Sequence, residues 1–493
     1  MYSENKPDTI YCPDCWWSDK WDPISYAKEY NSNRSFFEQF SELREKVPAL
    51  ASLHQRNNEN CDFANYLSDN KNCYLIFAAS YNEDCYYDTF IQRCRKVVDS
   101  FFVFDSENCY RCIDCYSCYN LFFSQECESC SESYLLFGCR SCQNCIGSIG
   151  LANKQCYILN KKTTKEEFEK KRNEILSDKN KFEEFVKLFE ELKKTVPHKY
   201  YSGAKNENFV GDHIYNCKNT FQCFDVTNLE DCKYCHWLHK AKDCFDVYGW
   251  GLTGELGYEN HLVGNNFFNV KFCYSCSNDV SNLTYCSECC NNSKNLFGCV
   301  SLTHKEFCIL NKQYSEAEYN KLTAQIIEKM KADGEWGEFY PMSMSPFCYN
   351  ETQAQEFFPL TKEGALKLGA KWLDEDYSPK YEGSSIVPEA IEVYKNSEVK
   401  QQELLNGVII CEKSGKPFKI TAPELAFYIE NNLSIPTKHY EVRYEENFTK
   451  RNPRKLYHRK CMNEGCKNEF ETTYAPERPE KIYCEKCYLD SVG

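Results

Sequence analysis

The amino-acid sequence predicts a mainly β protein: a cysteine-ladder β-solenoid in two tandem units with capping helices, plus small zinc-ribbon modules at the ends. Three observations predict this fold. Cysteines recur with a period of three, like residues recur at a longer spacing of 21, and the whole cysteine-rich stretch occurs twice. Such repeats indicate an architecture in which each repeat stacks on its neighbours, because one repeat alone cannot bury its apolar face.

The cysteines between positions 61 and 145 share one register, in which every gap is a multiple of three. Neither an α-helix nor a strand has that period, whereas a coil of three-residue steps does. Because Cys73, Cys94 and Cys115 lie 21 residues apart, as do Phe101 and Phe122, we expect rungs of about 21 residues. The register comprises Cys61, Cys73, Cys85, Cys94, Cys109, Cys112, Cys115, Cys118, Cys127, Cys130, Cys139, Cys142 and Cys145.

The second copy shares its borders with the first. Residues 58–60 and 206–208 both read Asn-Glu-Asn, and residues 159–161 and 310–312 both read Leu-Asn-Lys. A glycine-rich insertion at 249–264 precedes cysteines that have lost the register, and we expect it to form a loop. The expected domains are a half zinc ribbon and helix (1–57), the first solenoid unit (58–160), a helical connector (161–205), the second solenoid unit (206–312), a helical and irregular connector (313–405), a degenerate zinc ribbon (406–445) and a C-terminal zinc ribbon (446–493).

A helix is expected directly after each solenoid unit. Thr164 with Glu167, and Ser315 with Glu318, have the spacing of a capping box. These helices would cover solenoid ends, where an open rung exposes unpaired strand groups.

Composition narrows the class of protein. The net charge of −14 disfavours nonspecific nucleic-acid binding by the whole surface. The chain has 34 cysteines in 493 residues, whereas disulfide scaffolds are usually far shorter. The first residues lack an apolar signal segment, and no apolar run is long enough to span a membrane. We expect a cytoplasmic protein with mostly reduced thiols and no membrane contact.

The strongest chemical signal lies at the C-terminus. Cys461 and Cys466 form one pair and Cys484 and Cys487 another. Two such pairs on two hairpin knuckles have the spacing of a four-thiolate zinc site, since zinc takes four soft ligands in a tetrahedron. A ribbon this small depends on its metal to fold. We therefore predict zinc as the cofactor.

The N-terminus repeats half of that ribbon, because Cys12 and Cys15 align with Cys484 and Cys487 at a constant offset of 472. Two interpretations are open. The first knuckle belongs to an upstream start, or Cys12 and Cys15 bind zinc with ligands from elsewhere, for which Cys348 and Cys411 are candidates.

A third segment begins at Cys411 and carries a knuckle-like turn. Cys411 and Gly415 fit a CxxCGK pattern, but Ser414 stands in place of the second cysteine and only His439 lies near the position of a later pair. Residues 411–443 resemble a small bacterial zinc-ribbon family. The resemblance implies a degenerate ribbon that has lost its metal.

Three long strings carry a wider resemblance that, with the repeats, covers nearly the whole chain. They are CPDCWWSDKWDP, GEWGEFYPMSMSPFCYNETQAQEFFPLTKEGAL and RNPRKLYHRKC. With these strings the chain is similar to cysteine-rich solenoid proteins with zinc-ribbon ends from candidate-phylum bacteria. That family has no established activity, so the resemblance implies architecture alone.

The Cys-x-x-Cys runs inside the units have two interpretations. Cys109, Cys112, Cys115 and Cys118 could ligate zinc or an iron–sulfur cluster. The period-three register predicts the same positions without any metal, so we favour stacked structural thiols.

In the second unit, Cys232, Cys235, His236 and His239 form the best metal candidate outside the ribbons. The register already accounts for its two cysteines. Redox use of such pairs is a further alternative.

A basic segment precedes the C-terminal ribbon. Residues 438–460 contain eight lysines or arginines against three glutamates. Such a segment either grips nucleic-acid phosphates or serves as a solvated linker or a face docked on the acidic solenoid. The candidate phosphate-binding residues are Arg451, Arg454, Lys455, Arg459 and Lys460.

These patterns favour a non-enzymatic zinc-binding scaffold or interaction protein that presents a solenoid face to an unidentified protein partner. One alternative is a nucleic-acid-associated protein that uses the basic segment and the C-terminal ribbon. Another is a metal-dependent or redox protein that uses solenoid cysteines. The sequence contains no nucleophile elbow, phosphate-binding glycine loop or HExxH motif, so an enzyme is the less favoured class.

Overall fold

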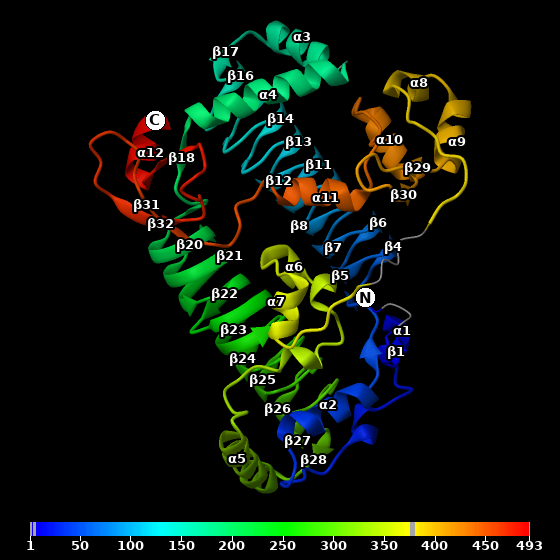
Figure 1. Ribbon diagram of the computed structural model, residues 1–493, viewed down its shortest axis with the longest axis vertical. Coiled ribbons are helices and arrows are strands. Elements are labelled where there is room, and N and C mark those ends of the chain that lie inside the picture. Colours follow the sequence, from blue (N-terminus) through cyan, green and yellow to red (C-terminus); the bar gives the residue numbers. More distant parts are fainter. Residues whose placement is uncertain (1, 3–5, 177, 375–379, 493) are drawn as a thin grey trace.

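The computed structural model describes residues 2, 6–176, 178–374 and 380–492, and parallel strands form most of its core (Figure 1). Three sheets of six, seven and ten strands dominate the described chain. A final antiparallel strand closes two of them, which covers an edge that would otherwise expose unpaired backbone groups. The predicted mainly β class is confirmed. Among the described helices, none combines the length and apolarity that a membrane span requires.

In unit one (residues 58–160), most strands belong to one of two parallel sheets, and isolated parallel bridges continue the pairing between them. β10 and β12 belong to the six-stranded sheet, and β11, between them in the chain, belongs to the seven-stranded one. The strands are β3 (His54–Gln55), β4 (Glu59–Asp62), β5 (Asn65–Ser68), β6 (Lys71–Tyr74), β7 (Phe77–Ser80), β8 (Thr89–Gln92), β9 (Arg95–Val98), β10 (Phe101–Phe104), β11 (Glu107–Tyr110), β12 (Ile113–Tyr116), β13 (Tyr119–Phe122), β14 (Ser131–Tyr134), β15 (Gln143–Ile146), β16 (Gln155–Ile158) and β17 (Lys161–Lys162).

Neighbouring strands of these sheets are offset by twelve positions in the sequence. Phe101 pairs with Ile113, and Glu107 pairs with Tyr119. The chain therefore returns to each sheet at every twelfth residue, and the predicted 21-residue rung is wrong. Both 12 and 21 are multiples of three, and the cysteine register contains both spacings. The twelve-residue spacing is the more frequent one, as in Cys61/Cys73/Cys85 and Cys115/Cys127/Cys139.

The three-residue step is confirmed, and its origin is a left-handed residue at every third position. Asn108 and Arg111 both have φ of 52°. Each directly precedes a fully buried cysteine, Cys109 or Cys112. Asparagine and aspartate, which tolerate this conformation best, occupy many of these positions. Each sharp turn points the next side chain into the core.

Unit two (residues 206–312) begins with twelve residues per turn and continues with thirteen. Phe224 pairs with His236, the twelfth residue after it, whereas Gly254 pairs with Phe267, the thirteenth residue after it. The ten-stranded sheet contains β19 (Gly203–Ala204), β20 (Glu207–Tyr215), β21 (Lys218–Lys233), β22 (His236–Lys242), β23 (Phe245–His261), β24 (Phe267–Lys271), β25 (Val280–Thr284), β26 (Lys294–Phe297), β27 (Glu306–Ile309) and β28 (Lys312–Gln313).

The extra residue in each longer turn explains why the cysteines of unit two leave the register. Thirteen is not a multiple of three, so each such turn shifts the next buried position by one. Successive turns place two left-handed residues together, as at Asn278 and Asp279, and Asn278 donates a hydrogen bond to Asn291 of the next turn (3.1 Å). The predicted loop at 249–264 is wrong over most of its length, because β23 runs through to His261.

Two elongated cores follow from these turns. In unit one the core consists of the register cysteines other than Cys61, which is only partly buried, together with residues such as Leu67, Ile91 and Val103, all at most 2% exposed. In unit two a second core of the same composition runs from Ile214 to Cys308. Thiols thus alternate with aliphatic side chains of similar size in a close-packed interior.

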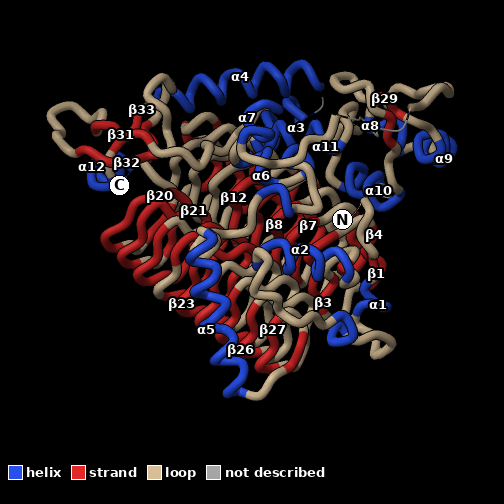
Figure 2. The backbone as a smooth tube through the Cα atoms, turned by 60° about the horizontal axis from the view of Figure 1, so that its bottom comes forward, coloured by secondary structure: helices blue, strands red, loops and turns tan. Residues whose placement is uncertain are grey.

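We call the stacked strands of each unit a ladder. Helices lie against the ends and sides of the two ladders (Figures 1 and 2). Phe185 of α4 packs against Ile146 and Ile149 of unit one, and Phe36 of α2 packs edge-on to Phe297 of unit two, with 5.2 Å between ring centroids. Both predicted capping boxes are present, at Thr164/Glu167 and Ser315/Glu318.

The remaining elements are β1 (Ile10–Tyr11), α1 (Pro13–Trp16), η1 (Pro23–Tyr26), α2 (Phe36–Lys46), β2 (Ala49–Leu50), α3 (Lys165–Leu176), α4 (Lys179–Thr195), β18 (Pro197–Lys199), α5 (Glu316–Asp333), η2 (Met342–Met344), η3 (Tyr349–Glu351), α6 (Gln353–Phe357), α7 (Lys362–Lys367), α8 (Ile391–Lys395), α9 (Glu398–Asn406), β29 (Ile409–Ile410), β30 (Pro417–Phe418), α10 (Ala422–Glu430), α11 (Tyr440–Phe448), β31 (Tyr457–Lys460), β32 (Glu469–Thr472), β33 (Lys481–Tyr483) and α12 (Glu485–Val492).

Candidate metal centre

The first half of the candidate centre is the turn between β31 and β32, which pair antiparallel. The backbone N–H of Cys461 donates to the carbonyl of Asn468 (2.9 Å), and that of Cys466 donates to the carbonyl of Asn463 (3.1 Å). Gly465 has φ of 78°, a left-handed conformation that glycine adopts without strain. The turn therefore brings both thiols to one side of the hairpin.

The second half lies where β33 meets α12. Cys484 directly precedes the helix, and Cys487 lies in its first turn. The N–H of Met462 donates to the carbonyl of Ile482 (3.0 Å), which ties the two halves together. We call β31 to α12 (residues 457–492) the C-terminal module.

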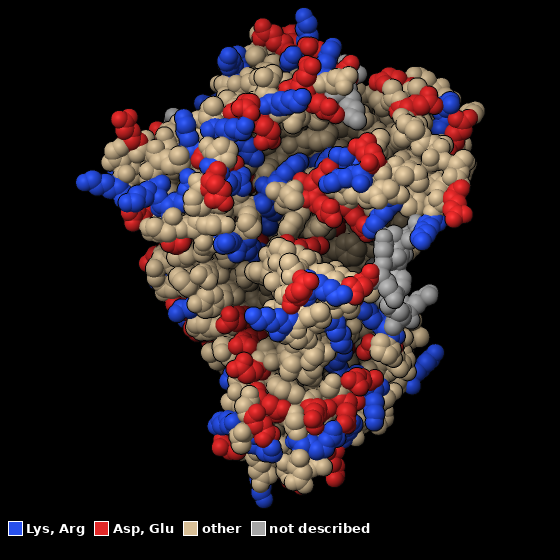
Figure 3. Space-filling view, in the orientation of Figure 1, with Lys and Arg blue, Asp and Glu red and all other residues tan. Residues whose placement is uncertain are grey.

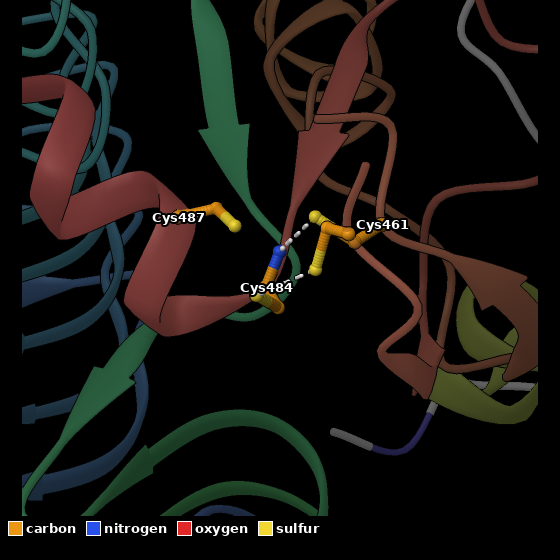
Figure 4. A group of neighbouring side chains, drawn as sticks. Cys461, Cys484 and Cys487 are labelled. Carbon is orange, nitrogen blue, oxygen red and sulfur yellow. Dashed lines mark hydrogen bonds between the residues drawn. The ribbon is translucent and has the colours of Figure 1, made fainter. Parts of the chain in front are cut away.

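The four cysteine side chains of the C-terminal module lie close together. The sulfur atoms of Cys461, Cys466, Cys484 and Cys487 all lie within 4.8 Å of one another, and those of Cys466 and Cys484 are 3.9 Å apart. Tetrahedral zinc with sulfur at ~2.3 Å requires sulfurs ~3.8 Å apart. Figure 4 shows Cys461 and Cys484 on facing segments, with Cys487 projecting towards them from α12. This group could hold a metal ion.

The surroundings favour a thiolate at Cys484. Burial raises the pKa of its thiol, but hydrogen bonds from the Asn468 side chain (3.3 Å) and from Cys487 outweigh burial and lower that pKa to about 7. The N–H of Cys484 in turn donates to the Cys461 sulfur (3.3 Å). Metal binding requires deprotonated cysteines, so these donors prepare the site for a cation.

The C-terminal module docks where the connector enters unit two. β33 pairs in parallel with β18, and the Thr472 hydroxyl donates to the carbonyl of Tyr200 (2.6 Å). The ring of Tyr200 stacks on Phe470 (4.4 Å between centroids), and the Thr473 hydroxyl donates to Asp212. The four-cysteine group therefore lies in a module that is joined to unit two and its connector.

A buried cluster of charges, which the sequence did not predict, lies beside this module. Arg451 pairs with Asp114 of unit one (2.9 Å) and with Asp225 of unit two (2.5 Å). Arg454 also pairs with Asp225 (2.7 Å), and its guanidinium lies 3.9 Å from the centroid of Phe357. The segment before the module thus joins the two ladders by ion pairs.

The acidic members of this cluster, with His213, have ligand atoms within 4.8 Å of one another. Two guanidinium groups already occupy the carboxylates, and burial of a further cation beside them would cost free energy. The pKa of Asp225 is raised by burial, but Arg451 and Arg454 reverse that effect and hold it well below its usual range. We therefore regard this cluster as a structural junction.

The junction contains two of the five residues named for the predicted nucleic-acid surface, which itself stays a prediction. The side chains of Arg451 and Arg454 are 6% and 4% exposed, so they are not available to phosphates in this structure. Arg459 donates to the carbonyl of Ala475, Lys460 pairs with Glu469, and the ammonium of Lys455 lies over the Tyr457 ring. Figure 3 shows acidic and basic side chains intermixed on the visible face.

Cys12 and Cys15 lie at the surface. Both are exposed: Cys12 is the N-cap of α1 and Cys15 lies within that helix, and hydrogen bonds from Cys15 lower the pKa of Cys12. Within the described residues no third histidine, cysteine or carboxylate completes a group with them. Cys348 and Cys411 do not complete it either. Zinc at Cys12 and Cys15 stays a prediction.

The structure does not bring Cys232, Cys235, His236 and His239 together as ligands in the part of the chain that it describes. The two thiols are fully buried in the core of unit two. The imidazole of His236 instead stacks on Phe224 (5.4 Å between centroids), its pairing partner in the preceding turn of the ladder. The three-residue step explains why the thiols and imidazoles are apart. In this step the cysteine points into the core, and the histidine that follows it does not.

Comparisons with known proteins add little. No family model matches the chain, and no curated protein matches it. Among solved structures, the crystal structure of a "putative acetyltransferase" from Desulfovibrio desulfuricans G20 is 9% identical, with 56% of this chain and 81% of that chain covered. Its TM-score of 0.12 is too low to carry an argument about fold or activity.

Proposed function

We propose that this protein is a non-enzymatic scaffold: two β-solenoid units joined by a C-terminal zinc ribbon, with a ladder face that binds a protein partner. Kinship with the cysteine-rich solenoid proteins of candidate-phylum bacteria and a cytoplasmic location belong to the same proposal. The docked four-cysteine module is the observation that carries it.

The solenoid part of the proposal is supported by the register of the sheets. Parallel pairing at every twelfth or thirteenth position recurs along both units, and every step adds one strand beside the previous one. Such an arrangement produces long regular faces, which repeat proteins use to bind partners.

The zinc part is supported by ligand chemistry. Four cysteine sulfurs within 4.8 Å, with no open position for a substrate in the ligand set, match a closed structural site. Cys461, Cys466, Cys484 and Cys487 would hold the ion. A bound ion would hold the two knuckles in place, and with them strand β33, which pairs with β18.

A candidate partner face lies on unit two. An open groove of about 560 Å³ crosses β21 to β25, and Phe268 on its wall is 45% exposed. Lys240, Lys242, Glu230 and Glu255 also line it. An apolar side chain among charges of both signs suits a protein segment better than a phosphate backbone.

The test uses the full chain and two variants. We expect the purified wild type to contain about one zinc ion per chain, and Cys461→Ser to contain none. Phe268→Ser should leave the zinc content unchanged. It should reduce the amount of partner protein that is cross-linked to the chain in cells and recovered with it. Wild-type protein without zinc would contradict the zinc part of the proposal. Partner recovery that Phe268→Ser does not affect would contradict the proposed partner face.

A further inference from the structure

A polar cavity lies where five parts of the chain come together, and neither the four-cysteine group nor the proposed partner face includes it. Unit one contributes Glu126 to its lining, the connector Lys193, unit two Asp212, the segment before the C-terminal module Lys450, and the module itself Tyr474. We call it the hub cavity. The centre of a water molecule has about 20 Å³ in which to move there. The cavity therefore suits a compact group of a few atoms and excludes a peptide or a sugar chain.

Most charged groups of the lining already have partners. The pairs are Arg451 with Asp114 and Asp225, Arg478 with Glu480, Lys199 with Glu485, and His213, when protonated, with Asp114. The Asp212 carboxylate accepts hydrogen bonds from the Ser202 N–H (2.7 Å) and from the Thr473 hydroxyl. These groups neutralise one another and leave little charge for a ligand.

Two ammonium groups of the lining have no carboxylate partner. Among the described residues, none forms an ion pair with Lys193 or Lys450. The Lys193 ammonium lies over the Phe137 ring (4.0 Å to the centroid), and Lys450 donates only a long hydrogen bond to Asn447 (3.5 Å). Burial lowers the pKa of Lys193, because it outweighs the nearby carboxylates. A desolvated cation without a partner costs free energy, and an anion in the cavity would offset that cost.

Tyr474 supplies a hydrogen-bond donor to the same cavity. The residue is only 7% exposed, and its hydroxyl has no hydrogen-bond partner within the part of the chain that the structure describes. Arg478 lies over its ring (5.3 Å to the centroid), and the His198 ring packs beside it (6.0 Å between centroids). Burial raises the pKa of Tyr474, so the hydroxyl keeps its proton at neutral pH and can donate it to an anion.

One carboxyl group of the lining opposes an anion. Glu126 has no ion pair and no hydrogen-bond donor among the described residues. Burial raises its pKa to about 7, although His213 and Lys193 act in the other direction. Near neutral pH a proton on Glu126 therefore reduces the repulsion. With Glu126 neutral, the two unpartnered ammonium groups match the charge of a divalent oxyanion.

We propose that the hub cavity binds a small oxyanion, inorganic phosphate or sulfate, held by the ammonium groups of Lys193 and Lys450 and by the hydroxyl of Tyr474. The anion would connect unit one, the connector, unit two and the C-terminal module at one point. The cavity is too small for a nucleic-acid or lipid chain, so the ligand is the free anion. This inference does not depend on the proposed zinc or partner face.

The experiment titrates sodium phosphate, and separately sodium sulfate, into the purified full-length chain at pH 7.5 by isothermal titration calorimetry. Sodium chloride of equal ionic strength is the control titrant. We expect saturable binding of the oxyanions at millimolar concentration or below, and none of chloride. Lys193→Met should weaken phosphate binding by about tenfold or more, because a charged hydrogen-bond donor is lost. Lys187→Met, on an exposed lysine of the same helix α4, should leave it unchanged.

Glu126→Gln should have the opposite effect. It removes the carboxylate that repels the anion and adds an N–H donor, so we expect phosphate to bind about threefold tighter or more. A purely structural role of the lining does not predict this gain. Weaker phosphate binding in Glu126→Gln would overturn the proposal.

Absence of oxyanion binding at millimolar concentration would also overturn it. Equal weakening by Lys193→Met and Lys187→Met would show an adventitious ion only and would overturn it as well. Should Lys193→Met fail to fold by circular dichroism, Tyr474→Phe decides, since it keeps the ring under Arg478 and removes only the hydroxyl. We expect it to weaken phosphate binding by about tenfold. Unchanged phosphate binding in Tyr474→Phe would then contradict the proposal.

Discussion

The cysteines of the ladders and those of the C-terminal module are the same residue in opposite settings. In the ladders, thiols such as Cys115 and Cys286 are fully buried and stand at positions that valine or leucine also occupies. In the module, Cys466 and Cys487 are partly exposed, and backbone turns hold all four sulfurs in one group. The ladder positions use the size of a thiol, whereas the geometry of the module suits the ligand chemistry of a thiol.

The largest expected effect comes from the module. Cys484→Ser removes one of four ligands, and structural zinc contributes on the order of 10 kcal/mol to folding in isolated zinc fingers. We expect residues 457–492 to lose protection from hydrogen exchange while the ladders keep theirs. Cys290→Ser is the matched control and should retain protection throughout. Protected module amides in metal-free Cys484→Ser would contradict this expectation.

The second effect concerns the junction between the two ladders. Arg451→Met leaves Asp114 without the guanidinium that pairs with it at 2.9 Å, and loss of one partner of a buried pair costs about 3–5 kcal/mol. Urea unfolding should report this loss. Lys455→Met, on an exposed neighbour, should change the free energy of unfolding by no more than about 0.5 kcal/mol. Equal effects of the two substitutions would contradict the interpretation of this cluster as a structural junction.

Acid should weaken the same junction. The folded-state pKa of Asp225 lies below its ordinary value, because Arg451 and Arg454 outweigh the effect of burial. Its contribution to stability is therefore fully present above about pH 4 and is lost as pH falls through the folded-state pKa. The free energy of unfolding should change less between pH 5 and pH 3 in Asp225→Asn than in the wild type. An unchanged difference would show that Asp225 does not carry this dependence.

A smaller effect tests the longer turns of unit two. A Cβ atom at Gly254 would lie 2.0 Å from the Phe267 ring, so Gly254→Ala forces repacking at about 1–3 kcal/mol. Gly364→Ala, where the nearest atom is 3.5 Å away in α7, should be neutral or stabilise by up to about 1 kcal/mol. Thermal melting distinguishes the two. A neutral Gly254→Ala would contradict the close contact within the ladder.

The smallest effect should come from a ladder thiol. Cys127→Val is expected to cost less than about 1.5 kcal/mol, because valine has a similar volume and Val103 occupies an equivalent buried position. Chemical denaturation measures it. A cost as large as that of Cys484→Ser would abolish the distinction between ladder and module.

The sequence predicted the three-residue step because each left-handed turn places one side chain inside, and cysteine marks enough of those positions to reveal it. The sequence also contains the twelve-residue pairing, as in Cys115, Cys127 and Cys139, but it does not stand out. Val97, Ser106 and Leu121 replace cysteine in other columns, and several cysteines are also 21 residues apart. The loop predicted at 249–264 is instead part of the ladder. One extra residue in each of several successive turns looks, in the sequence, like a loss of the repeat.

The candidate metal centre could be predicted because all four ligands lie within 27 residues, where local spacing determines geometry. The junction could not. Asp114 and Asp225 are far apart in the sequence, and only the packing of two ladders brings them to Arg451. A run of basic residues says nothing about which carboxylates will face it.

The most direct test of the central claim is the metal content of the reduced protein by native mass spectrometry, after expression without added metal. We expect about one zinc ion per wild-type chain, none in Cys484→Ser, and the wild-type zinc content in Cys127→Val. A wild-type chain without zinc, or zinc retained by Cys484→Ser and lost from Cys127→Val, would contradict the proposed zinc site.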